Sequence, residues 1–164
     1  MKTFSLTLLL LTLLANLQPG HAQSTDPKSA ERISKLADEF LRSYNEDFGS
    51  YKLDAWMEHW SDDAVRESSR ERREGKKAIR RAYEDILRGT SENRLTHEKA
   101  RMIVGNRVAW QGDYAGRSRQ SGRPVQVPIA IFLTFNDAGK ITHAQYYLDL
   151  DHLNDQRQGK APIR

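Results

Sequence analysis

The chain has 164 residues, of which 38% are hydrophobic and 29% are charged, so it has room for one soluble domain with a modest core and none for a second domain. Its formal net charge of +4 comes from 26 basic and 22 acidic residues that are interleaved along the chain, and so small an excess does not indicate binding to nucleic acid. The sequence contains no cysteine, which excludes disulfides and thiol nucleophiles.

Residues 1–22 differ in composition from the rest of the chain. A basic start at Lys2 precedes a short apolar run over residues 6–17 and small residues up to Ala22, an order typical of a secretory signal peptide. We expect cleavage after Ala22, export to the periplasm or the medium, and no stable membrane insertion afterwards. An uncleaved N-terminal anchor is the alternative, although the apolar run is short for a membrane span. Lipid attachment is excluded because no cysteine follows the run.

A polar linker over residues 23–28 leads into three segments with the three-and-four apolar spacing of amphipathic helices. This spacing predicts helices over residues 33–44, over residues 53–60 and between residues 76 and 88. Pro27 suits the first turn of the first helix, where its missing N–H costs nothing. Each of the three segments has one apolar face, so all three predicted helices need a surface to pack against.

The most basic segment, residues 66–77, lies between the second and third predicted helices. Acidic residues compensate most of its charges, and no aromatic residues are interleaved on which nucleic-acid bases could stack. These features favour a solvated loop. Contact with an anionic ligand or a lipid surface is the alternative.

Beyond the third predicted helix the apolar period changes from about 3.6 residues to 2, which indicates strands. The strands are expected over residues 99–104, 108–114, 125–135 and 141–149. Pro128 cannot donate to a ladder, so it predicts a bulge or a bend in the third of these strands. Helices followed by an antiparallel meander favour an α+β fold, in which three helices cover one face of a strongly curved sheet and leave a cone with a mouth.

The final predicted strand separates two sets of side chains. His143, Gln145, Tyr147 and Asp149 fall on one face because side chains alternate along a strand. If this face lines the cavity, it supplies an imidazole, an amide, a phenol and a carboxylate. If it faces water, it is an ordinary polar surface.

Four sequence motifs resemble those of the SnoaL-like branch of the NTF2-like superfamily, over residues 29–158. The motifs occupy residues 53–65, 75–79, 121–125 and 135–141, and the last is followed by Tyr147-Leu148-Asp149 and by Gln156. The resemblance implies a conical α+β domain with a largely apolar cavity that binds a small apolar molecule. It also implies that the domain often forms a homodimer through the outer face of the sheet. Residues 159–164 remain as a tail.

The resemblance also implies a chemistry for Asp149, which occupies the place of the final-strand aspartate of this family. In the polyketide cyclase members that aspartate acts as acid and base in an aldol ring closure without metal or organic cofactor. His143 is our candidate for an imidazole beside it, and Tyr147 or Tyr44 for a hydrogen bond to an oxyanion. The alternative is that Asp149 caps a closing helical turn around Leu153 or pairs with an arginine. Ser68 and its neighbour stand where ketosteroid isomerase relatives carry their aspartate, which disfavours steroid isomerisation.

A second group of residues is expected to contact a ligand without reacting. Its members combine apolar surface with a polar end, and they are Tyr44, Trp56, Trp60, Trp110 and Gln145. Tryptophans at such apolar spacing are more often part of the core. The acidic and histidine residues near position 150 match no calcium loop or zinc motif, so no metal is predicted.

Two functions remain open on the sequence. One is an enzyme that performs cofactor-free cyclisation, isomerisation, hydration or dehydration through Asp149. The other is a non-catalytic module that binds a ligand or forms a dimer. An open cavity lined by Asp149 would favour the enzyme, and a cavity filled by Trp56, Trp60, Phe132 and Tyr147 would remove its site.

Overall fold

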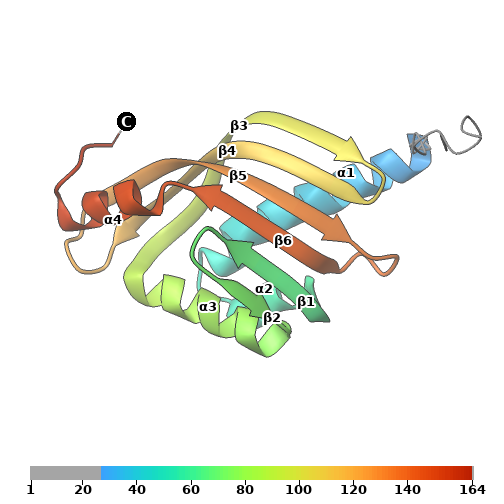
Figure 1. Ribbon diagram of the computed structural model, residues 1–164, viewed down its shortest axis with the longest axis horizontal. Helices are drawn as coiled ribbons and strands as arrows, with labels where there is room; N and C mark the ends of the chain where they lie inside the picture. Colours follow the sequence, from blue (N-terminus) through green and yellow to red (C-terminus); the bar gives the residue numbers. More distant parts are fainter. Residues whose placement is uncertain (1–26, 164) are drawn as a thin grey trace, which may run out of the picture.

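The computed structural model describes residues 27–163, so the predicted signal peptide lies outside the described part of the chain. The helices are α1 (Pro27–Ser43), a π-helical turn η1 (Tyr44–Phe48), α2 (Leu53–Met57), α3 (Lys76–Gly89) and α4 (Leu150–Gln158). The strands are β1 (Trp60–Ser68), β2 (Arg72–Glu74), β3 (Thr90–Val104), β4 (Arg107–Ser118), β5 (Pro124–Phe135) and β6 (Ile141–Leu148). The predicted α+β class is confirmed (Figure 1). Within residues 27–163 no helix has the length and apolarity needed to cross a membrane.

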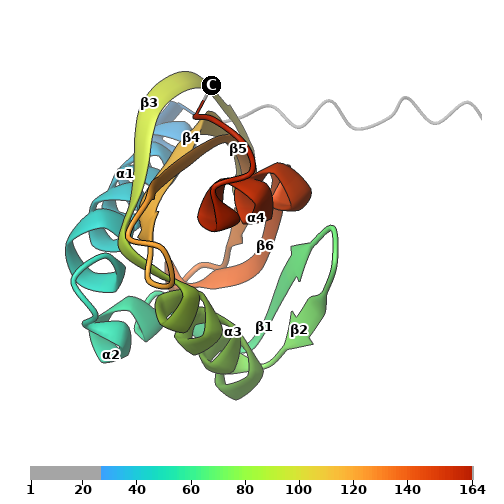
Figure 2. The same ribbon diagram turned by 90° about the vertical axis from the view of Figure 1, so that its left-hand side faces the viewer.

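The strands of the described chain form one six-stranded sheet in the order β2-β1-β6-β5-β4-β3. All neighbours are antiparallel except β1 and β6, which are parallel. Register shifts interrupt the β3–β4 pairing at two places, and within each the residue Glu92 or His97 has a positive φ. Bulges of this kind bend a strand. The sheet accordingly curls, with α3 and α4 at its open side (Figure 2), as expected for a cone.

The core lies on the inner face of this sheet. The inward residues of β5 alternate from Val125 to Phe135 and are all at least 95% buried, so one face of this strand is buried along its whole length. Helix α1 adds Phe40, and α2 adds Trp56, whose ring packs against Phe40 and against Tyr83 of α3. The first three helices therefore close one side of the curled sheet through aromatic contacts.

Pro128 causes no bulge, contrary to the sequence prediction. The β4–β5 register runs through the Asp113–Pro128 pair without a shift, and pairing with β6 begins only at Ile129. The part of β5 before Pro128 is covered by helix α4, where the buried side chain of Gln156 accepts from the backbone N–H of Gln126 and donates to its carbonyl. The amide of Gln156 thus makes the backbone hydrogen bonds that a neighbouring strand would otherwise make to Gln126.

Three predicted elements have other bounds in the structure. Helix α2 ends at Met57, and Trp60 begins β1 instead of ending the helix. The basic segment predicted as a loop forms most of the β1–β2 hairpin, and β3 begins at Thr90, well before the predicted start of this strand at residue 99. In each case pairing with a distant strand or hairpin partner outweighs the local pattern. The hairpin matters most, because it brings Arg66 to the inner face.

Candidate functional site

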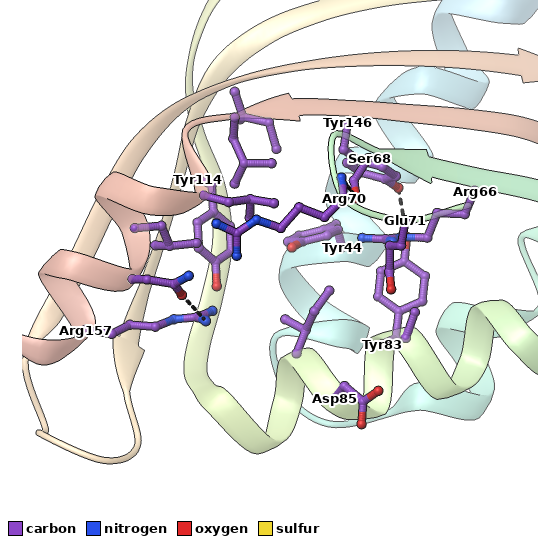
Figure 3. Close-up of a pocket in the computed structure, with 17 residues that line it drawn as sticks. Tyr44, Arg66, Ser68, Arg70, Glu71, Tyr83, Asp85, Tyr114, Tyr146 and Arg157 are labelled. Carbon is purple, nitrogen blue, oxygen red and sulfur yellow. Dashed lines mark hydrogen bonds and ion pairs between the residues drawn. The ribbon is translucent and has the colours of Figure 1, made fainter. Parts of the chain in front are cut away.

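A cavity of about 470 Å³ lies between the inner face of the sheet and helices α3 and α4 (Figure 3). The β1–β2 hairpin forms a further part of its wall. Much of the lining is aliphatic, including Ile86 of α3, Ile129 of β5 and Leu153 of α4. The volume suits a small organic molecule, and the wall suits a largely apolar one.

Tyrosines from four separate elements contribute to the cavity wall, namely Tyr44, Tyr83, Tyr114 and Tyr146. The hydroxyls of Tyr83 and Tyr146 lie 2.8 Å apart and share a hydrogen bond, while Tyr114 donates to Asn93 Oδ1 at 2.5 Å. The Tyr44 hydroxyl has no hydrogen-bond partner among residues 27–163. Burial raises the pKa of all four tyrosines, so at neutral pH they are uncharged and able to donate.

Arg66 is the charged residue most deeply placed in this wall. It pairs with Ala144 in the β1–β6 register and therefore shares the inner face. It is 7% exposed, and its guanidinium lies 5.2 Å from the ring centre of Tyr83 and 4.8 Å from that of Tyr146. Burial lowers the pKa of Arg66, but Tyr83, Tyr146 and Glu71 outweigh that effect and raise it. The side chain is therefore a buried permanent cation.

Other charged residues lie around the cavity. Arg70 forms an ion pair with Asp151 of α4, which joins the hairpin to that helix, and Arg157 of α4 donates to Asn154 at 3.3 Å. The two lining carboxylates are both engaged: Glu71 pairs with Arg66 and Arg73, and Asp85 pairs with Arg88. No histidine of the described chain lines the cavity. The site thus has abundant donors and no uncommitted base.

The family model described as the SnoaL-like domain matches residues 41–144, which is more than half of the chain. The chain belongs to the SnoaL-like domain family. A comparison with curated protein sequences found no match.

Solved structures share the fold of this SnoaL-like domain at low sequence identity. AclR of Streptomyces galilaeus, which carries the name hydroxylase, is 21% identical with a TM-score of 0.66, over 82% of this chain and 100% of that one. A Xanthomonas campestris protein that carries the name polyketide cyclase is 17% identical with a TM-score of 0.68, over 79% and 98%. An LEH-like epoxide hydrolase of M. tuberculosis is 17% identical with a TM-score of 0.63, over 82% and 94%. At these identities the likeness shows the fold alone.

Asp149 does not line the cavity of this SnoaL-like domain. It is exposed and forms the N-cap of α4, where its carboxylate accepts from the backbone N–H of His152 at 2.9 Å. This is the structural alternative that the sequence left open. The predicted placement of Asp149 in the cavity is wrong, because the chain leaves β6 at Leu148 and turns into the helix.

His143, Gln145 and Tyr147 lie on the outer face of the sheet, so their predicted cavity placement is also wrong. His143 Nε2 and Gln145 Nε2 contact Glu67 Oε2 at 3.0 and 2.7 Å, and Tyr147 is 53% exposed and packs edge-on against Phe132. The cavity receives the other side chains of β6, including Tyr146 and Leu148. The alternation of side chains along β6 was predicted correctly, but the set that faces the cavity was not.

The predicted contact residues divide between the core and the cavity. Trp56 and Trp60 are at most 1% exposed and belong to the core, and Trp110 is buried with its Nε1 donating to Glu98. None of the three tryptophans lines the cavity, whereas Tyr44 does. Sequence reasoning missed Arg66, Tyr83 and Tyr146 as site residues. The alternation of Ala64, Arg66 and Ser68 could have revealed Arg66 only if the strand and its inner face were already known.

The described residues contain no group of three or more histidine, aspartate or glutamate side chains suited to hold a metal ion. Asp149 and Asp151 lie at the start of α4 on the protein surface. The chemistry that this site offers is hydrogen bonding and charge stabilisation by tyrosine and arginine. It can hold an oxygen-bearing molecule, and it can stabilise negative charge on that oxygen.

Proposed function

We propose that this SnoaL-like domain binds a small, mostly apolar molecule that presents an oxygen acceptor to the tyrosine and arginine cluster of the cavity. The observation that carries the proposal is that one cavity has both an aliphatic wall and a cluster of polar side chains. The cluster consists of Tyr44, Tyr83, Tyr146 and Arg66. A few convergent polar groups in an apolar hollow are typical of small-molecule sites.

Binding is better supported than acid/base catalysis. A proton-transfer site needs a group free to exchange a proton, and both lining carboxylates, Glu71 and Asp85, are held in ion pairs. The observation that favours chemistry is the Tyr83–Tyr146 pair beside Arg66, which has the donors of an oxyanion site. Our second candidate is therefore cofactor-free cyclisation, isomerisation, hydration or dehydration of a carbonyl compound, with oxyanion stabilisation by these three residues.

A matched pair of variants tests cavity binding. Ala82→Phe places a ring in the cavity from α3, and Ala130→Phe places one on the outer face of β5. With methyl 2-naphthoate as a neutral probe in calorimetry, we expect binding by the wild type and by Ala130→Phe and loss of binding by Ala82→Phe. Native mass spectrometry of purified protein should also show a bound small molecule in the wild type. Equal binding by all three proteins would overturn the proposal.

We also propose that the chain is exported after removal of residues 1–22. The support is the sequence order of a basic start, an apolar run and small residues. Expression of the full chain in a bacterial host, followed by mass measurement of the protein in each fraction, is expected to give a periplasmic or secreted product beginning at Gln23. An unprocessed product in the membrane fraction would support the anchor instead.

The outer face of the sheet is proposed as a homodimer surface. Four apolar or aromatic side chains there are 44–65% exposed: Met102, Val104, Phe132 and Tyr147. A contiguous apolar surface of this kind favours association. We expect a dimer in analytical ultracentrifugation and a monomer for the variant Phe132→Glu. A wild-type monomer at high concentration would remove this proposal.

A further inference from the structure

We infer that the ligand is acidic and that Arg66 binds its carboxylate. This inference rests on the proposed binding function, because it assigns the chemical class of the molecule that the same cavity takes. The carboxylate would lie against the guanidinium between the two tyrosine rings, and the apolar remainder would lie against the aliphatic wall.

The first argument is the incomplete hydrogen bonding of Arg66. One of its N–H groups donates to Glu71 at 2.9 Å, whereas Nε is buried and has no partner among residues 27–163. The side chain is 8% exposed, so water has little access to it. Buried donors of a charged group are costly when unpaired, and an oxyanion against the part of the guanidinium that lines the cavity would offset that cost with charge-assisted bonds.

The second argument is orientation. In Figure 3 the guanidinium of Arg66 extends from β1 toward Tyr44, between the rings of Tyr83 and Tyr146. Cation–π contacts with both rings restrict the guanidinium before a ligand arrives, which reduces the entropy lost on binding. A planar, fixed guanidinium matches the geometry of a carboxylate. The unpaired hydroxyl of Tyr44 on the same wall offers the carboxylate a further donor.

The third argument is the charge around the cavity. Arg66, Arg70 and Arg157 line it, and the buried Nε of Arg157 also has no partner in the described chain. Glu71 and Asp85 are the only acidic residues of the described chain in the lining, and both are in ion pairs. Cations around a low-dielectric hollow raise the local concentration of anions. The aliphatic wall requires that the rest of the anion be apolar.

A purely structural role for Arg66 makes a different prediction. In that case its function is to hold Glu71 and the β1–β2 hairpin, and substitution would change stability and the binding of charged and neutral ligands alike. If Arg66 instead binds the ligand, its substitution would weaken the binding of charged ligands more than that of neutral ligands. The experiment therefore compares an acid with its own ester.

The probes are 2-naphthoate and methyl 2-naphthoate, which share their apolar ring and differ in charge. We expect calorimetry at neutral pH to show that the wild type binds the acid at least about tenfold more tightly than the ester. Arg66→Met should abolish this preference by weakening acid binding at least about tenfold, with ester binding changed less than about twofold. Arg72→Met, which removes an exposed arginine from the same hairpin, is the matched control and should keep the preference.

The outcomes separate the inference from the function on which it rests. Ester binding by the wild type without a preference for the acid would overturn the acidic ligand and leave cavity binding standing. Failure to bind either probe would overturn both. Equal loss of acid and ester binding in Arg66→Met, with a folded protein in circular dichroism, would show the structural role instead. The wild-type comparison decides the question even if Arg66→Met does not fold, and Arg157→Met gives a second test of the cationic wall.

Discussion

The two faces of the sheet both carry polar groups, but they use them differently. On the outer face Glu67 accepts from Gln145, contacts His143 and forms an ion pair with Arg72. On the inner face, across the same pair of strands, Arg66 keeps a buried Nε without a partner within residues 27–163. The outer set is satisfied by its own members, whereas the inner set is incomplete.

This difference shows which feature marks a binding site. The outer residues of β6 looked more reactive in the sequence, because they include a histidine and an amide. Their hydrogen bonds, however, are already made to Glu67 of β1 on the outer face of the sheet. A buried cation with incomplete hydrogen bonding beside an apolar cavity is the stronger signal, since a bound ligand can complete its contacts. Four pairs of substitutions test these assignments, in order of decreasing effect.

The largest contrast is expected between adjacent residues of β5. Ile131 points inward and is fully buried, and Phe132 points outward and is 44% exposed. Ile131→Ala should lower the free energy of unfolding by about 2–5 kcal/mol because it leaves a cavity in the core. Phe132→Ala loses mainly its contact with Tyr147 and should cost at most about 1.5 kcal/mol. Urea denaturation measures both, and equal losses would contradict the assigned faces.

The next contrast compares two tyrosine hydroxyls. Tyr83→Phe breaks the buried hydrogen bond to Tyr146 and leaves that hydroxyl without this partner, at a cost of about 1–3 kcal/mol. Tyr147→Phe on the outer face removes a hydroxyl with no hydrogen bond in the described chain and should stay within about 0.5 kcal/mol of the wild type. Chemical denaturation is the measurement. A larger loss for Tyr147→Phe would reverse our view of the two faces.

Asp149 gives a smaller effect that separates a cap from a catalyst. Asp149→Ala should cost about 1 kcal/mol because the N-cap of α4 is lost, whereas Asp149→Asn retains a capping oxygen and should be nearly neutral. Binding of methyl 2-naphthoate should be unchanged in both variants. If Asp149→Asn abolished binding or an identified turnover without a change in melting temperature, the catalytic role would be restored.

The last contrast concerns Glu67 and the dependence of stability on pH. Hydrogen bonds from Gln145 and His143, with a further contribution from Arg72, lower the pKa of Glu67 from 4.5 to about 2. Because the pKa is lower in the folded state, the stabilisation is fully present above about pH 4.5 and is lost as the pH falls through about 2. Glu67→Gln should therefore flatten the pH dependence of the urea midpoint between these values. Glu31→Gln on exposed α1 is the charge-matched control, and identical acid limbs would contradict the shift.

The fold was largely predictable, and the site was not. Helical spacing gave α1 and α3, and alternation gave the buried face of β5, because these patterns depend on local geometry and one buried side. Helix α2 was predicted too long and the β1–β2 hairpin was missed, since their form depends on partners elsewhere in the fold. Tyr44, which the sequence predicted as a ligand contact, does line the cavity. Arg66 was assigned to a solvated loop because twelve residues of mixed charge look like a surface when the strand partner is unknown.

The sequence by itself determined the α+β class, the order of the helices and long strands, and the two alternating sets of side chains on β6. Only the tertiary structure decided which set faces the cavity. A strand repeats every two residues, so its sequence separates two faces without stating which one is inside, and that choice depends on curvature, pairing and the helices that cover the sheet. Here the choice turned Tyr146 and the neighbouring Arg66 inward and left Asp149 to cap a helix.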